Sequence, residues 1–309
     1  MQTYCNMIKF LLLLVVLLPF YATAQDEETP TDIVDTTKRL HAGVYIGVYY
    51  PNKYSTNLYD GYGFNPDGIK NDFANSFMNQ QINFFYGGGN GGTDQIANIL
   101  NVNHADWSFG ETDMPYNLGY NMAYIVGFNG SYNLNKKSAI IFNINGTKLT
   151  MNGKFTINTV NKTNGSVTPS TIHQCTILGG EQRVMFQFGY QKVLTNHDKF
   201  NFFIEGGLNI VMAKLLQNKI IISNNNTPNG NSLEIDLTSF YNQSNYTYYK
   251  SKLTSVGYGI FAGAGLHLTI NPKYTIQALY NPSYDRVNLG QAPTFKFNHG
   301  FGLRFYYNF

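Results

Sequence analysis

The 309-residue chain has few charged residues and, after its first 24 residues, no long apolar run. Charged side chains make up 13% of the sequence, whereas soluble domains carry about 25%. A membrane-spanning helix needs about 20 consecutive apolar residues, so none is expected in the mature chain. The 21 Lys and Arg nearly balance the 18 Asp and Glu, which gives no electrostatic reason to expect a nucleic-acid partner. These shortages disfavour an ordinary soluble domain, a helical membrane protein and a nucleic-acid binder.

The first 24 residues have the order of a cleaved secretory signal peptide. A single cation, Lys9, precedes an apolar run over Phe10–Phe20, and an Ala-x-Ala motif ends at Ala24. This order predicts a signal peptide over 1–24, followed by a periplasmic N-terminal tail over 25–38. No cysteine sits at the cleavage point, so a lipid anchor is not expected.

Cysteine is nearly absent. Of the two cysteines, Cys5 lies in the predicted signal peptide, which leaves Cys175 as the only thiol. A disulfide within the mature chain is therefore excluded. The fold must be stable without covalent crosslinks.

Aromatic residues and glycine are abundant instead. The chain contains 24 Tyr, 23 Phe and 30 Gly, yet its mean hydropathy is only −0.23. In the C-terminal run TFKFNHGFGLRFYYNF, every second residue back from Phe309 is apolar except His299. The same period of two recurs over the ranges 40–50, 118–128, 184–190, 200–210 and 256–270. This period predicts strands with one apolar face and one polar or glycine-rich face.

The order of these strands predicts an all-β fold, an eight-stranded antiparallel transmembrane β-barrel over 39–309 with long extracellular loops. The strands are expected near 39–50, 116–134, 137–158, 172–194, 199–216, 250–270, 273–285 and 294–309. Short turns such as NLNKKS and INPKY alternate with long loops near 51–115, 161–171, 217–249 and 286–293. This alternation is typical of outer-membrane barrels, and an even strand number puts both termini in the periplasm.

The predicted strands are longer than a membrane requires. Several approach ~20 residues, whereas ~9–11 residues suffice to cross the bilayer. The barrel is therefore expected to project above the membrane.

The strands of a water-soluble β-sandwich or lipocalin would also alternate between apolar and polar residues. In such a fold the apolar face points inward, where it fills a core or binds a ligand. The glycine-rich face, which includes Gly257, Gly259, Gly263 and Gly265, would then form the exterior. The clustering of Tyr and Phe at strand ends instead favours the aromatic girdles of a membrane barrel.

Two strands and the secretory N-terminus carry a resemblance to a known class. The runs HAGVYIGVYY and GFGLRFYYNF resemble strands of the small outer-membrane β-barrel proteins of Bacteroidota, whose architecture is similar to the OmpA transmembrane domain. The resemblance covers nearly the whole mature chain. It implies that Phe305, Tyr307 and Phe309 belong to the assembly signal read by the barrel-assembly machinery.

If Phe309 faces lipid, the alternate face of each strand points into the lumen. Glu205 and Arg304 each lie about five residues from a periplasmic strand end, so they are expected at similar heights. Buried charges must pair, which favours a polar plug that stabilises one register; a narrow gated pore is the alternative. The predicted lumen network comprises Arg39, His41, Glu181, Arg183, Glu205, His267, Lys296 and Arg304.

The first long loop, 51–115, contains two amphipathic patterns. The first predicts a helix capped by Asn65, and the second predicts a short helix capped by Thr93. The glycine run between them, 87–92, is expected to act as a hinge. The apolar faces either pack on each other as a lid or form a docking surface for a partner. The candidate docking residues are Ile69, Phe73, Phe77, Phe84, Ile96 and Leu100.

No catalytic residue, metal site or cofactor is predicted. His104, Asp106, Glu111 and Asp113 fall close together in the loop, but scattered loop acids are more often solvated than metal-bound. No serine, histidine and acid occur at one height on the strands. His299, near the outer interface, is the only weak candidate for catalysis.

The sequence supports three functional hypotheses. The first is a non-catalytic subunit of a larger outer-membrane complex for secretion, insertion or uptake, with its loops docked on a protein partner. The second is a small-molecule channel like OmpW, which would need an apolar upper lumen. The third is a surface lipid-modifying enzyme, which would need a catalytic group at the rim.

Overall fold

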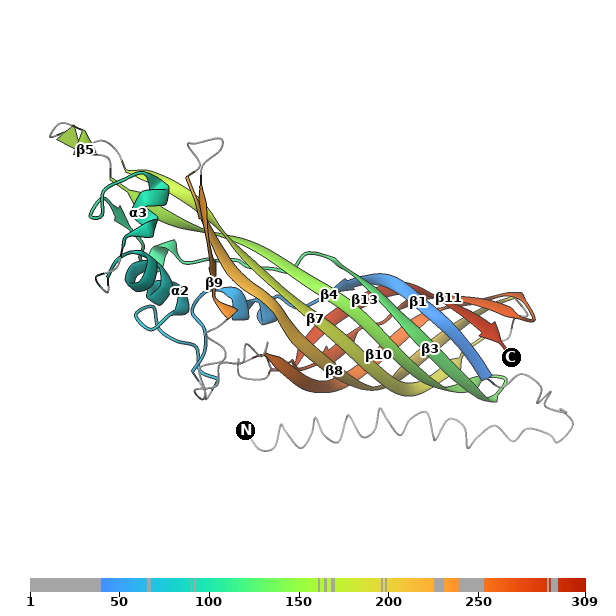
Figure 1. The fold of residues 1–309 in the computed structure, drawn as a ribbon. Coiled ribbons are helices and arrows are strands. Elements are labelled where there is room, and N and C mark those ends of the chain that lie inside the picture. The colour runs from blue at the N-terminus through green and yellow to red at the C-terminus, as the bar shows by residue number, and fades with distance from the viewer. Residues whose placement is uncertain are drawn as a thin grey trace, which may run out of the picture.

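A closed antiparallel β-barrel forms the body of the protein in the computed structural model (Figure 1). The structure describes residues 40–309 except 66–67, 90, 92, 161, 164–165, 168–169, 196, 198, 225–230, 239–252, 288 and 290–293. Eight strand positions form the ring. In ring order they are β1 (Leu40–Tyr50), β3 (Ala123–Asn135), β4 (Ser138–Thr159), β7 (Thr171–Val193), β8 (Phe200–Ser223), β10 (Thr254–Asn271), the interrupted position β11 (Tyr274–Tyr280) with β12 (Ser283–Asp285), and β13 (Lys296–Asn308).

The remaining elements belong to the connections. They are η1 (Lys53–Tyr59), α2 (Phe77–Asn79), the π-helical turn η2 (Gln80–Tyr86), α3 (Gln95–Leu100), β2 (Trp107–Ser108), η3 (Glu111–Asp113), β5 (Lys162–Thr163), β6 (Ser166–Val167) and β9 (Ser232–Asp236). Among the residues that the structure describes, no helix is both long enough and apolar enough to cross a membrane.

The two ends of the ring differ. One end, here called the turn end, holds the short connections β3–β4, β7–β8 and β10–β11. The C-terminus lies at the same end, where the N–H of Phe309 donates to the carbonyl of Leu40 at 3.1 Å (Figure 1). Pairing of β1 with β13, from His41↔Asn308 to Tyr50↔His299, closes the ring. The opposite end, the loop end, carries the long connections.

The predicted all-β class and eight-stranded barrel are confirmed. The strand predicted from 116 begins only at Ala123, because the preceding segment forms just an isolated bridge between Tyr120 and Met151. The strand predicted over 199–216 continues to Ser223.

The position predicted as one strand over 273–285 is interrupted. Its break falls at Asn281 and Pro282, and proline has no N–H to give to the ladder. Arg39, the predicted signal peptide over 1–24 and the tail over 25–38 lie outside the described residues.

The ring is polar inside and apolar outside. Outward side chains such as Tyr124, Phe128 and Leu208 are exposed, whereas inward Asn143 and Arg304 are buried. A soluble sandwich or lipocalin would have the reverse arrangement, so that alternative is wrong for the ring. Further exposed apolar side chains on the ring are Val126, Phe142, Phe188, Phe202, Ile204, Ile210, Tyr258, Phe301 and Phe305.

This polarity inverts where β4, β7 and β8 extend past the ring at the loop end. On β4, outward Phe142 and Ile144 are followed by outward Lys148, Thr150 and Asn152. The inward face changes in the opposite sense, from polar to apolar: Asn143, Asn145 and Thr147 are followed by Leu149, Met151, Phe155 and Ile157, all buried. The extension therefore has the polarity of a soluble protein.

Helices from the first long loop cover the apolar face of this extension. Figure 1 shows α2 and α3 beside the far ends of β4 and β7. Leu58, Met78, Ile82 and Ile96 are fully buried there in one cluster with Ile157 and other strand residues. We call this packed unit the loop-end domain.

The helix starts in this domain differ from those predicted. Asn65 does not cap a helix; its N–H donates to the carbonyl of Ile69 at 2.8 Å in a tight turn. Helix α2 starts at Phe77, because the Ser76 hydroxyl accepts the N–H of Asn79 at 3.1 Å. Helix α3 is capped by Asp94, one residue after the predicted Thr93; its carboxylate accepts the N–H of Ala97 at 2.8 Å.

Candidate functional site: the polar lumen

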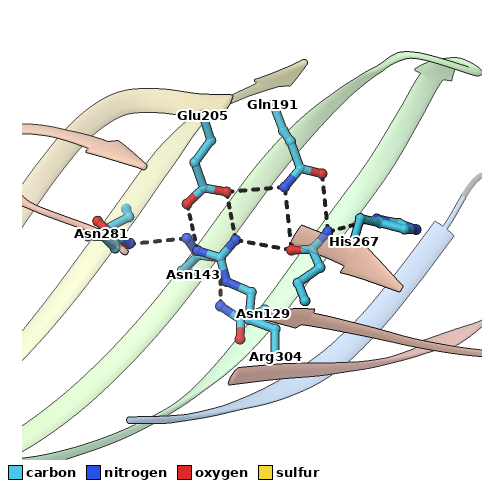
Figure 2. A network of polar contacts seen from close by, with 9 residues as sticks. Asn129, Asn143, Gln191, Glu205, His267, Asn281 and Arg304 are labelled. Carbon is cyan, nitrogen blue, oxygen red and sulfur yellow. Dashed lines mark hydrogen bonds and ion pairs between the residues drawn. The ribbon is translucent and has the colours of Figure 1, made fainter. Parts of the chain in front are cut away.

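A buried ion pair crosses the lumen between Glu205 on β8 and Arg304 on β13. Arg304 donates from Nη1 to Glu205 Oε2 at 2.6 Å and from Nη2 to Oε1 at 2.7 Å. Both side chains are excluded from solvent. Two parallel bonds of this kind are the strongest geometry for an arginine and a carboxylate. Because β8 and β13 are not neighbours in the ring, the pair bridges the lumen between two separate parts of its wall (Figure 2).

Two glutamines continue this network toward the turn end. Gln191 donates to Glu205 Oε2 at 3.2 Å, and Gln277 Oε1 accepts from Arg304 Nη1 at 3.4 Å. Gln277 Nε2 then faces His267 Nδ1 at 3.2 Å. Arginine can only donate and carboxylate can only accept, so the ion pair determines the orientation of both amides. It follows that His267 accepts at Nδ1 and carries its proton on Nε2.

A second layer centres on Asp285 of β12. Its carboxylate accepts from Ser283 Oγ at 2.6 Å, Asn209 Nδ2 at 2.9 Å and Asn298 Nδ2 at 3.0 Å. Asn298 Oδ1 also accepts the N–H of Asn52 at 2.9 Å, which ties this layer to the start of the first long loop. The Asp285 carboxylate is thus held by neutral donors in the lumen.

A third layer closes the lumen toward the loop end. Arg183 Nε donates to Glu181 Oε1 at 2.7 Å, and both side chains are buried on β7. Tyr59, at the end of η1, donates its hydroxyl to Glu181 Oε2 at 3.3 Å. Arg183 Nη1 lies 3.5 Å from the hydroxyl of Tyr49 on β1. The first long loop therefore inserts a tyrosine into the mouth of the barrel.

The other predicted lumen residues lie nearer the ends. His41 Nδ1 is 2.6 Å from Asn308 Oδ1, and its Nε2 is 2.7 Å from Asn133 Nδ2. Lys296 does not join the lumen network as predicted: its Nζ lies 4.6 Å from the ring centroid of Tyr54 at the loop end. It is the first residue of β13, where η1 presents an aromatic ring to its ammonium group.

Asp285, Tyr49 and Tyr59 are lumen residues that sequence reasoning missed. Ser283 and Asp285 continue the alternation of β11 beyond Pro282, so the period of two did carry a signal for Asp285. Tyr59 had no comparable signal, because its place depends on how the loop folds back over the barrel.

The predicted docking surface is wrong for four of its six residues. Phe77, Ile96 and Leu100 are buried in the loop-end domain. Phe73 packs on the same core, with its ring 5.9 Å from that of Phe109. The inverted strands supply an apolar face of their own, which these side chains cover. The exposed candidates are Ile69, at 63%, and Phe84, at 43%.

The acids of the loop do not form a metal cluster. Within the described ranges, no three histidine, cysteine or acidic side chains lie close enough to hold an ion. His104 instead contacts Asp94 at 2.6 Å, and Asp113 accepts from Thr156 and Asn158 at 2.6 and 2.9 Å. Asp106 accepts from Asn103 at 2.9 Å. These acids hold polar side chains of the domain together by hydrogen bonds.

Asp60 is a buried acid of the loop-end domain. Burial raises the pKa of its carboxyl, and Lys70, with Nζ 2.6 Å away, opposes that rise.

His299, the only weak catalytic candidate, lies on the exterior with Nδ1 2.7 Å from the hydroxyl of Tyr280. Its ring stacks on that tyrosine. The described contacts of His299 are thus aromatic and phenolic, and include no serine or acid.

Comparisons with known proteins give fold-level similarities only. No protein-family model matches the chain, and no curated protein matches it. Among solved structures, Ail of Yersinia pestis, in complex with the heparin analogue sucrose octasulfate, is 11% identical, with a TM-score of 0.30 over 87% of this chain and 98% of that one. OprG from Pseudomonas aeruginosa is 7% identical, with a TM-score of 0.33 over 88% and 96%.

A third similar structure is an enzyme. The outer membrane protease OmpT from Escherichia coli is 8% identical, with a TM-score of 0.31 over 91% of this chain and 100% of that one. All three TM-scores lie below 0.5, so these similarities support no functional assignment. The function has to be argued from the geometry of the chain itself.

Proposed function

We propose that the chain is an integral outer-membrane protein whose plugged barrel anchors the loop-end domain outside the cell. The observation that carries this proposal is the inversion of polarity along β4, β7 and β8. An apolar exterior around the ring fits lipid, and a polar exterior around the extension fits water. Lys148, Gln182 and Lys214, paired in register across these strands, mark the change. The proposal keeps the predicted orientation, with long loops extracellular and termini periplasmic, and the polar exterior of the extension at the loop end is compatible with it.

A matched pair of variants on β4 tests the membrane assignment. Phe142→Arg places a charge in the apolar band, whereas Asn152→Arg places it on the same face of the extension. In lipid, arginine near the midplane costs about 2–4 kcal/mol, while an exposed surface substitution stays within about 0.5 kcal/mol. We expect Phe142→Arg to lower the amount of folded, heat-modifiable protein in the outer-membrane fraction and Asn152→Arg to leave it unchanged. Equal tolerance of both variants would exclude a lipid-facing Phe142.

The proposed role is a non-catalytic one, as a subunit that docks on a protein partner of a larger outer-membrane complex. Three buried layers of charged and polar side chains cross the ring, which supports an anchor more than a conduit. A channel of the OmpW kind would need an apolar upper lumen, and Arg183, Glu181 and Asp285 occupy it instead. A lipid-modifying enzyme would need a nucleophile or acid beside His299, and its described contacts provide neither.

The predicted assembly signal and the strand resemblance are also part of this proposal. Phe305, Tyr307 and Phe309 all lie exposed on the outward face of β13 or at its end, which suits an assembly signal. The Bacteroidota class and the OmpA-like comparison rest on the strand resemblance alone.

A further inference from the structure

A cavity of about 220 Å³ lies inside the ring at the turn end, below the Glu205–Arg304 pair. His41, His267, Gln277 and Tyr306 line its inner part, and the exposed Lys136 and Lys137 line its rim. The rim residues lie on the β3–β4 turn, so the cavity reaches the surface at that turn. Neither the plug nor the loop-end domain accounts for this space.

The inner part of the cavity offers hydrogen-bond donors. As derived above, the ion pair and Gln277 leave the proton of His267 on Nε2. The hydroxyl of Tyr306 is buried beside the Arg304 guanidinium, and it donates a hydrogen bond to no described residue. An unsatisfied buried hydroxyl costs about 1–3 kcal/mol, so a group that accepts from it would be stabilising. His41 adds no free nitrogen, because both ring nitrogens already have partners.

The charged side chains that the structure describes on the lining of the cavity and on the turns at this end are all lysines. Lys136 and Lys137 line the rim, while Lys199 and Lys273 lie on the other two turns of this end. None of the lining residues is an aspartate or glutamate, and Glu205 just above is fully engaged by Arg304. This balance favours an anion and disfavours a metal ion, for which acidic ligands are lacking.

The donor arrangement favours a carboxylate over a more highly charged anion. The inner donors are a neutral imidazole and a phenol, which suit a single negative charge shared by two oxygens. The lysines stand only at the rim, where they attract the anion without being desolvated. A doubly charged phosphate would instead leave most of its charge uncompensated inside the ring.

We propose that this cavity is a carboxylate-binding site, with His267 and Tyr306 as inner donors and Lys137 at the rim. Two sources of carboxylate are available at this end. One is a free carboxylate in the surrounding solution. The other is the N-terminal tail, which contains Asp26, Glu27, Glu28, Asp32 and Asp35 immediately before β1.

The tail is close enough in sequence to supply the carboxylate. Asp35 precedes His41 by six residues, which span at most about 20 Å when extended. A short tether of this kind gives an effective concentration in the millimolar range. The experiment must therefore separate the tail from a free ligand.

The test follows the His267 and Tyr306 side chains by NMR in the full mature chain, selectively labelled at histidine and tyrosine. Sodium acetate is titrated at constant ionic strength against sodium chloride. The same titration is run on a variant in which the five tail acids are replaced by Asn or Gln. If a free carboxylate is the ligand, both proteins show saturable acetate shifts with equal affinity. If the tail is the ligand, neutralising it changes the starting shifts, and acetate binds the variant at least tenfold more tightly than the parent.

Two neighbouring tyrosines provide the matched control. Tyr306→Phe removes only the inward hydroxyl, and Tyr307→Phe removes the outward one. In the tail-neutralised chain we expect Tyr306→Phe to weaken acetate binding about tenfold or more, and Tyr307→Phe to leave it unchanged. The site is overturned if acetate shifts neither side chain more than chloride does in the neutralised chain. It is also overturned if the two Phe variants bind acetate equally well.

Discussion

At the residue scale, Arg304 determines the orientation of several neighbours. Its guanidinium can only donate, so Glu205 and Gln277 must present acceptors to it. Gln277 must then turn its amide nitrogen to His267. One buried cation thus sets the protonation site of an imidazole two contacts away.

The ion pair makes a prediction that a double-mutant cycle can test. Arg304→Met or Glu205→Gln alone leaves its partner without the charge that neutralised it, so each should lower the free energy of unfolding by about 3–5 kcal/mol. The double variant should cost less than the sum of the two. Urea unfolding of the refolded barrel in micelles, followed by circular dichroism, measures all three. Additive effects, or single effects below about 0.5 kcal/mol, would contradict the buried pair.

At the element scale, β10 shows why one face of a strand is rich in glycine. A Cβ on Gly263 would lie 2.7 Å from Cγ of Glu205, and one on Gly259 would lie 2.4 Å from Cβ of Asp285. The inner face of β10 therefore leaves space for acids from β8 and β12. The period of two in the sequence indicated which residues of β10 share this face, but the lumen side chains explain why these residues are glycines.

Two adjacent residues of β10 test this explanation. Gly263→Val should displace Glu205 and lower the free energy of unfolding by about 1–3 kcal/mol, the usual cost of overpacking. Ala264→Val, on the outward face, should change it by less than about 0.5 kcal/mol, because valine suits an exposed strand position. Denaturant unfolding of the two variants side by side gives the comparison. A neutral Gly263→Val would mean that the lumen is not closely packed at Glu205.

At the scale of the whole molecule, the barrel and the loop-end domain obey opposite polarity rules. The ring buries polar side chains, whereas the loop-end domain buries Met78, Ile82 and Ile96 like a soluble protein. The anchor and the exposed domain are continuous because β4, β7 and β8 run through both. Binding to a partner is therefore expected to depend on the exposed face of the domain and not on its core.

The partner hypothesis predicts that substitutions on the exposed face of η2 prevent the partner protein from co-purifying with the barrel. Phe84 and the neighbouring Phe85 are exposed on η2, so Phe84→Asp with Phe85→Asp should leave the domain folded and remove bound protein after mild detergent extraction. The control, Gln95→Glu with Asn98→Glu, adds the same charge on the exposed face of α3 and should retain the partner. Mass spectrometry of the co-purifying proteins, with tryptophan fluorescence of Trp107 as a check on folding, provides the measurement. Equal recovery with both double variants would place the partner elsewhere.

Much of the fold could be predicted because side-chain direction along a strand is a local property. The alternation from Phe295 to Phe309 is enough to assign an apolar and a polar face to β13, and repeated alternation is enough to predict a barrel. Helix starts were less predictable, because Ser76 and Asp94 act as caps only where the packed loop brings the backbone into a helix. The buried state of Phe77, Ile96 and Leu100 had no local signal at all, since exposed and covered apolar faces have the same periodicity.

The sequence by itself determined the class of fold, the order of the strands and which side chains share a face. These depend on a period of two and on turn residues that act over a few positions. Only the tertiary structure decided what each face meets. It joined Arg304 and Glu205, which the sequence places at similar heights, through two parallel hydrogen bonds, placed Tyr59 in the mouth of the barrel and turned the apolar loop helices onto the inverted strands. The physical reason is that contacts between distant segments depend on ring closure, register and loop path, which no single stretch of sequence contains.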